Sequence, residues 1–233
     1  LGRNHPETLS AEVNLASMYY EQGRTSDLEP LLTEAVGRLR AALGVDHPTT
    51  LNAMNLMAIL RQSQGRFREA EELHTEVLDS KRRVLGPQHL FTLTSMDNLG
   101  IVYGFEGRYE EAERICREAL EGYEPKMGAQ HRNTLAMKSN LAEYLRNQGR
   151  FDDAEQLFRR IMEVQGRTMP TSDSFRLETL AGFGILHALK GDAARAEGVF
   201  QEVLERRRAT LPPDDPGLAD AMNLLVQVRL ARG

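Results

Sequence analysis

A 42-residue repeat constrains this chain more than any other feature of its sequence. Histidines recur 42 residues apart at His5, His47, His89 and His131, and turn glycines keep the same register at Gly23, Gly65, Gly107, Gly149 and Gly191. The repeats span residues 1–42, 43–84, 85–126, 127–168 and 169–210, and residues 211–233 form the first half of a sixth repeat or a capping helix. Repeats of this length bury their core against neighbouring repeats, so we expect residues 1–233 to form one elongated domain.

Each repeat is predicted to contain two helices. Pro follows His5, His47 and Asp215, at a first helical position where its missing N–H costs nothing. The first helix, called helix A, then runs about 16 residues to the turn glycine. The second, helix B, follows at once, and in the fourth repeat its apolar residues Ala154, Leu157, Phe158 and Ile161 have helical spacing. No strand pattern competes with this interpretation.

Small residues at two fixed places resemble a known family signature. Leu99-Gly100-x-x-Tyr103 in helix A, with Ala154-x-x-x-Phe158 and Ala196-x-x-x-Phe200 in helix B, resembles the tetratricopeptide repeat (TPR). The strings LGVDHPTTLNAM and QGRFREAEEL are similar to the 42-residue variant of kinesin light chains and related bacterial and fungal proteins. HEAT and armadillo repeats have a similar period, but they do not explain the Gly-Arg turn with Ala five residues later.

The resemblance implies an all-α fold, a right-handed superhelical solenoid of eleven helices. It also implies that Ala70, Ala112 and Ala154 are buried where helices cross.

Composition excludes several classes of function. Hydrophobic residues make up 41% and charged residues 27% of the chain, as in ordinary folded proteins. The net charge is −5, and Lys and Arg are spread through both halves, which argues against nucleic acid or a membrane surface as the partner. The absence of a long apolar segment and the single cysteine, Cys116, favour a cytoplasmic location.

No catalytic, cofactor or metal site is predicted. The histidines recur once per two-helix repeat, too far apart to bind one ion together, and Asp173 and Asp215 replace them later in the chain. We therefore interpret them as marks of helix starts. The recurring Glu29, Glu71, Glu113, Glu155 and Glu197, with Arg24, Arg66, Arg108 and Arg150, are charges near the start of helix B. They are interpreted as helix-dipole partners and local ion pairs, with a charged binding stripe as the alternative.

The family resemblance implies that helix A lines a concave groove. The register places these residues on the groove face: Asn14, Asn55, Ile59, Asp97, Asn98, Ile101, Phe105, Asn140, Glu143, Arg146 and Asn147. Amide side chains both donate and accept hydrogen bonds, which suits the backbone of an extended peptide. Ile59, Ile101 and Phe105 would add a small apolar pocket.

The leading hypothesis is a scaffold that binds a protein or peptide segment in this groove. Acidic residues on the same face, including Glu178 and Asp220, outnumber Arg146, so we expect a neutral-to-basic segment. The alternative is a regulatory sensor or oligomerisation arm of a larger signalling ATPase or kinase. Neither hypothesis makes the chain an enzyme.

Overall fold

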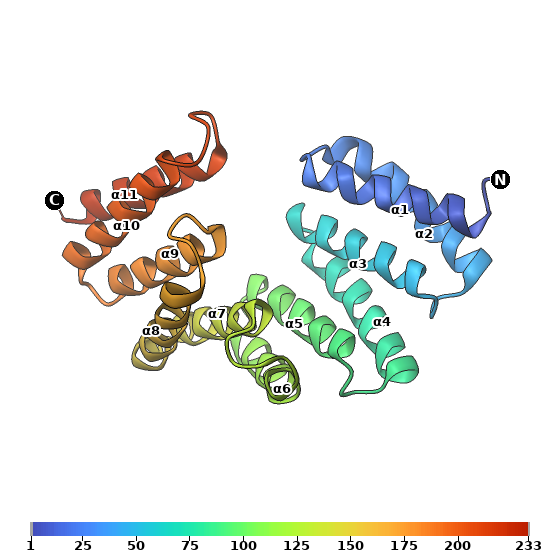
Figure 1. Ribbon diagram of the computed structural model, residues 1–233, viewed down its shortest axis with the longest axis horizontal. Coiled ribbons are helices and arrows are strands. Elements are labelled where there is room, and N and C mark those ends of the chain that lie inside the picture. The colour runs from blue at the N-terminus through green and yellow to red at the C-terminus, as the bar shows by residue number, and fades with distance from the viewer. Residues whose placement is uncertain (1, 233) are drawn as a thin grey trace. The chain divides into compact units, whose positions relative to one another are not determined.

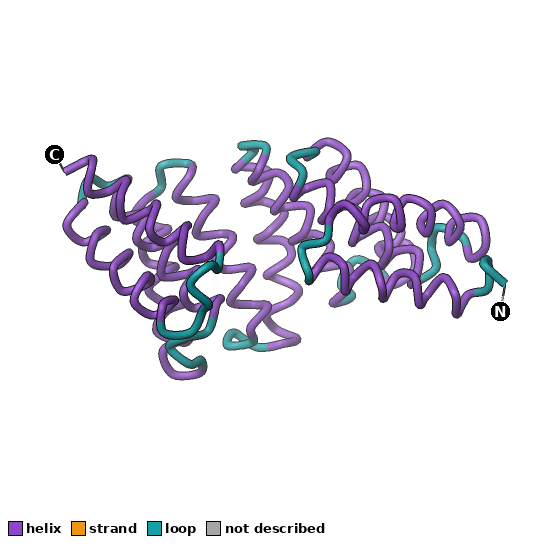
Figure 2. Tube along the Cα trace, turned by 90° about the horizontal axis from the view of Figure 1, so that it is seen from above, coloured by secondary structure: helices purple, strands orange, loops and turns teal. Residues whose placement is uncertain are grey.

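The chain folds into successive α-helices joined by short loops (Figures 1 and 2). The computed structural model describes residues 2–232, and eleven helices lie within this range. They are α1 (Pro6–Glu21), α2 (Thr25–Leu43), α3 (Pro48–Ser63), α4 (Phe67–Leu85), α5 (Leu90–Phe105), α6 (Tyr109–Met127), α7 (Arg132–Asn147), α8 (Phe151–Thr168), α9 (Ser174–Leu189), α10 (Ala193–Arg208) and α11 (Pro216–Arg232). Odd-numbered helices are helix A and even-numbered helices are helix B of each repeat, so the predicted all-α tandem fold is confirmed.

The recurring histidines cap helix A. The Nδ1 atom of His5, His47, His89 and His131 accepts a hydrogen bond of 3.2 Å from the backbone N–H two residues later. In α9 the carboxylate of Asp173 accepts from the N–H of Arg176 at 3.2 Å. Each cap satisfies one of the four backbone donors that a helix start leaves unpaired. The interpretation of these histidines as helix starts is confirmed.

The turn between helix A and helix B depends on glycine. The turn glycines predicted from the sequence all have positive φ, from 69° at Gly23 to 83° at Gly191. This conformation costs most residues steric strain but is open to glycine. It lets helix B start two residues later and return antiparallel to helix A.

Helix A and helix B of one repeat cross closely at small residues. Ala70, Ala112 and Ala154 have no exposed surface, as predicted. In the fifth repeat Gly184 of α9 approaches α10 so closely that a Cβ atom there would lie 2.6 Å from the ring of Phe200. Large side chains of helix B therefore fill the space that small residues of helix A leave open.

The chain divides into two compact units, Leu1–Tyr123 and Glu124–Gly233, with the boundary inside α6. In unit one α1 packs on α2 and α3, and α4 packs on α3 and α5. In unit two α7 packs on α8 and α9, and α10 packs on α9 and α11. One repeat register runs through both units, and a single solenoid stays a prediction from that register.

Candidate peptide-binding face

One narrow side of helix A is open to solvent in unit one. We call it the helix A strip; its members are Asn52, Asn55, Leu56 and Ile59 of α3 with Thr94, Asn98, Ile101 and Phe105 of α5, all exposed or half-buried. Their spacing of three and four residues places them on one face of each helix. The neighbouring Ala58, Leu60 and Leu99 are buried. The strip is therefore bounded by core on both sides.

Two amides join across the repeats on this strip. Asn98 of α5 donates a hydrogen bond of 3.0 Å from Nδ2 to Oδ1 of Asn55 of α3, and both side chains are half-buried. The bond uses one of the two N–H groups of Asn98 and one lone pair of Asn55. The remaining Oδ1 of Asn98 and amide N–H groups of Asn55 are suited to bind a peptide backbone. Asn14, from the first repeat, is exposed on α1.

Apolar side chains continue the strip toward the turn. Ile59 and Ile101 are half-buried, and Phe105, the last residue of α5, is 61% exposed. The ring of Phe105 stacks on that of Phe67, the first residue of α4, with centroids 5.4 Å apart and an angle of 5° between planes. Phe67 was not among the residues predicted from the sequence, because the groove was assigned to helix A alone.

The structure places two predicted site residues in the interior. Asp97 is 8% exposed and lies beside Cys116 of helix B, with Sγ 3.9 Å from a carboxylate oxygen. Arg146 is 9% exposed, and its Nη1 lies 3.4 Å from the carbonyl of Gly182. Because helix A is covered both by its own helix B and by a neighbouring repeat, the open face is narrower than the register predicted. Neither side chain lies on the open surface of helix A.

In unit two the corresponding residues of α7 are polar. Asn140 and Glu143 are half-buried and Asn147 is exposed. Burial raises the pKa of Glu143; Arg146 acts in the opposite direction, and Glu178 adds to the increase. Burial also raises the pKa of Glu178. The open surface of these helices is therefore polar and weakly acidic.

The repeats match the model of a known protein family. The model of the tetratricopeptide repeat family matches residues 7–83, 57–124, 105–167 and 132–209, which together cover most of the sequence. The chain belongs to the tetratricopeptide repeat family. No curated protein matches it.

Solved structures share the fold at low sequence identity. A protein of Podosopora anserina described as a kinesin light chain with nearly identical TPR-like repeats has a TM-score of 0.69 at 22% identity, over 89% of this chain and 99% of that chain. BtubC (BKLC) from P. vanneervenii has a TM-score of 0.69 at 21% identity, over 90% and 86%. NprR in complex with its cognate peptide NprX has a TM-score of 0.72 at 16% identity, over 97% and 62%. The resemblance to kinesin light chain repeats is thereby confirmed.

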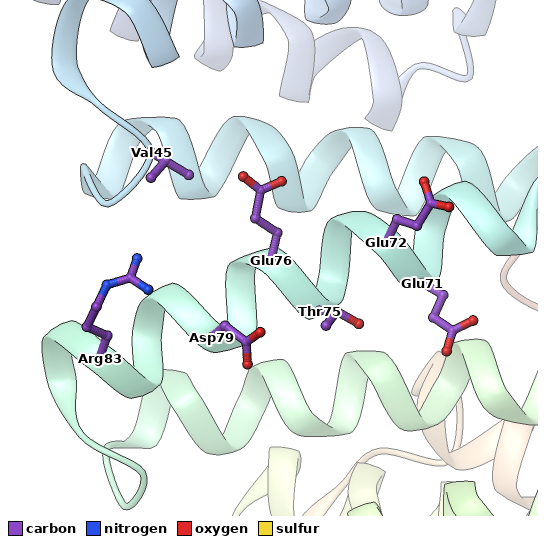
Figure 3. Close-up of a pocket in the computed structure, with 7 residues that line it drawn as sticks. All are labelled: Val45, Glu71, Glu72, Thr75, Glu76, Asp79 and Arg83. Atoms are coloured by element: carbon purple, nitrogen blue, oxygen red, sulfur yellow. The ribbon is translucent and has the colours of Figure 1, made fainter.

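A cleft beside one helix B of unit one, α4, was not predicted from the sequence. An open cleft of about 650 Å³ is lined by residues of α4 together with Val45 (Figure 3). Glu71 and Glu76 extend to opposite sides of α4 in this view. Both carboxylates are already paired, Glu71 with Arg108 at 2.9 Å and Glu76 with Arg40 at 2.6 Å. Two of the four acidic side chains that line the cleft are thus held by contacts within the fold.

The recurring Glu and Arg residues of the TPR turns link neighbouring repeats. Each turn arginine pairs locally with an acid three residues later, as Arg66 does with Glu69 at 2.7 Å, which confirms the predicted local pairs. Arg66 also contacts Glu29 of the preceding repeat at 2.9 Å. The three hydrogen bonds that Glu29 accepts, from Gln64, Arg61 and Arg66, lower its pKa to about 2. The sequence interpretation as dipole partners missed this link between repeats, which requires knowledge of how helices B stack.

The described residues contain neither a cluster suited to a metal ion nor a helix suited to spanning a membrane. Among residues 2–232, no group of three or more His, Cys, Asp or Glu side chains is arranged to hold a metal ion. Within the same range, no helix has the length and apolar character needed to cross a membrane.

Proposed function

We propose that this TPR chain is a docking module that binds an extended protein or peptide segment along helix A. The observation that carries the proposal is the half-buried amide pair of Asn55 and Asn98, which presents donors and acceptors beside apolar Ile59 and Ile101. Main-chain hydrogen bonds with neighbouring apolar contacts are a general way to bind extended peptides. NprR, which shares the fold, has been solved with its cognate peptide.

The proposed ligand is a neutral-to-basic segment. With Asp97 and Arg146 both buried, the charges on the open face of helix A are acidic, namely Glu143, Glu178 and Asp220. An acidic surface speeds the encounter with a basic partner and disfavours an acidic one. We propose that the partner is a protein or peptide rather than nucleic acid or a membrane, and that the chain acts in the cytoplasm. The proposed function needs no cofactor and no catalytic residue.

A peptide library tests this proposal. Random extended peptides are selected on the wild type and on the Asn98→Ala, Asn140→Ala double variant. We expect neutral-to-basic peptides to be enriched by the wild type and weakly by the variant, with unchanged helical circular dichroism, because half-exposed polar side chains contribute little to stability.

The matched control is Thr75→Ala with Gln156→Ala, one exposed polar residue on helix B of each unit. This variant should select the same peptides as the wild type. Enrichment of acidic peptides, or equal enrichment by the Asn variant and the wild type, would move the site away from helix A. That result would favour the alternative, a sensor or oligomerisation arm of a larger signalling ATPase or kinase.

A further inference from the structure

The stacked pair of Phe67 and Phe105 leaves one aromatic face open at the edge of the helix A strip. The rings are nearly parallel, so each covers only one face of the other. With 61% of its surface exposed, Phe105 presents its second face to solvent. An exposed, rigid aromatic surface is an anchor that binding sites commonly use.

The fold itself does not require this pair. The positions equivalent to Phe67 and Phe105 are Thr25 and Ser63 one repeat earlier, and Phe151 and Leu189 two repeats later. Of these three pairs, only Phe67 and Phe105 bring two aromatic rings together. The stack is therefore a property of this step of the array, and its exposure costs free energy unless something covers it.

Carboxylates outnumber cations around the stack. Arg66 and Arg68, which flank Phe67, contact Glu69 at 2.7 Å and Glu72 at 3.5 Å. Glu71 lies one helical turn after Phe67 on α4, and therefore on the same face of that helix. Arg108 contacts the carboxylates of Glu71 and Glu106 at 2.9 Å and that of Glu111 at 2.8 Å. Three carboxylates thus surround one guanidinium. The local excess of negative charge disfavours an acidic or purely apolar occupant and favours a cation.

The same edge already shows how such a cation binds an aromatic ring. The guanidinium of Arg108 lies 4.1 Å from the ring centroid of Tyr103, and that of Arg24 lies 4.2 Å from the centroid of Tyr19. A planar guanidinium can stack on a ring and pair with carboxylates at once, whereas a compact lysine ammonium cannot stack.

We propose that the open face of Phe105 is the subsite for an arginine side chain of the bound segment. The inference rests on the docking function proposed above and names one residue of its ligand. The arginine stacks on Phe105, and its charge is balanced by the carboxylates around Arg108.

Nuclear magnetic resonance of the full chain with ¹³C-labelled phenylalanine rings tests the subsite directly. The eight phenylalanines give few signals, and Phe105→Ala and Phe67→Leu assign the two that matter. The probe is the tripeptide acetyl-Gly-Arg-Gly-amide at millimolar concentration. We expect it to shift the Phe105 and Phe67 signals, whereas the citrulline peptide, which has the same shape without charge, and the leucine peptide should shift them much less.

The variants separate the aromatic and the charged contributions. Phe105→Leu should weaken tripeptide binding by roughly three-fold or more, as should Glu71→Gln with Glu106→Gln, since each removes one contribution. Phe91→Ala is the matched control, because Phe91 is 63% exposed at the other end of α5; it should leave binding unchanged. Equal shifts with the citrulline or leucine peptide, full binding by Phe105→Leu, or no shift with the arginine peptide would overturn the assignment.

The two proposals fail separately. Ring shifts with the arginine tripeptide but no selection from the peptide library would remove the docking function and keep an arginine subsite. Library selection that depends on Asn98, without ring shifts, would keep the docking function and remove the subsite.

Discussion

At the residue scale, one core place of helix B holds side chains of very different chemistry. It is occupied by Leu32, His74, Cys116, Phe158 and Phe200 in successive repeats, and all five are buried. Among the described residues, neither ring nitrogen of His74 has a hydrogen-bond partner. A buried polar group without a partner costs free energy on folding. The second repeat therefore contains two buried nitrogens without hydrogen-bond partners, whereas the first repeat has the apolar Leu32 at the same position.

Replacing His74 by leucine should stabilise the protein. Because the substitution removes unsatisfied nitrogens and copies the residue found in the first repeat, we expect the free energy of unfolding at pH 7 to rise by about 1–3 kcal/mol. Urea unfolding followed by circular dichroism measures the change. A destabilised variant would show that the histidine ring is held by contacts that leucine cannot reproduce.

The pH dependence provides a second measurement on the same pair of proteins. Burial, with a smaller contribution from the charge of Lys81, lowers the pKa of His74 from its ordinary 6.5 to about 4. A lowered histidine pKa means that the unfolded chain takes up the proton first. The titration of His74 therefore leaves the free energy of unfolding unchanged above pH 6.5 and lowers it as the pH drops from 6.5 toward 4. Between pH 7 and pH 5 the advantage of His74→Leu should grow by up to about 2 kcal/mol; a constant advantage would contradict the burial of a neutral ring.

At the scale of helices, the close crossing within a repeat decides which glycines are replaceable. A Cβ atom on Gly184 would lie 2.6 Å and 3.0 Å from two ring carbons of Phe200 and 3.0 Å from a methyl group of Val199. Gly198, on the facing helix α10, is exposed and has open space around its Cα. Both glycines weaken their helices relative to alanine, but only one of them is required by packing.

Alanine substitutions at these two positions should have opposite effects. Gly184→Ala gains helix propensity but overpacks the crossing, and we expect a net loss of about 1 kcal/mol in the free energy of unfolding. Gly198→Ala should gain about 0.5–1 kcal/mol. Thermal unfolding of the two variants beside the wild type measures both. A stabilised Gly184→Ala protein would mean that α9 and α10 lie farther apart than described.

The same crossings explain what the sequence could and could not predict. The helix starts and the turn glycines depend on local backbone geometry, and the alanines at the crossings recur with the 42-residue period. The helices, their caps and the close crossings therefore follow from the register. The width of the helix A strip depends on how much of each helix A is covered by its own helix B and by the neighbouring repeat. The sequence does not contain this information, so Asp97 was predicted to lie on the open face although it is buried. The stack of Phe67 on Phe105 joins helices of different repeats. The sequence of a single repeat therefore cannot predict this stack.

At the scale of the whole molecule, stability should be the sum of local contributions. Within each unit the helices pack mainly on their immediate neighbours along the chain, and α1 and α7 also pack on the equivalent helix of the next repeat, α3 and α9. Arrays held by nearest-neighbour contacts open in parts, with a free energy that differs from one region to another. The two compact units make such local opening a property that can be measured.

Native-state hydrogen exchange on Gly184→Ala provides this measurement. A loss of about 1 kcal/mol confined to unit two should lower the protection of amides in α9 and α10 roughly five-fold, because exchange from a locally opened state follows the free energy of that opening. Protection in α3 and α4 of unit one should equal that of the wild type within error. Gly198→Ala is the control of opposite sign, and it should raise protection in α9 and α10 alone. If Gly184→Ala instead lowers protection equally in all helices, the chain unfolds as one cooperative domain, and the additive description of its repeats is wrong.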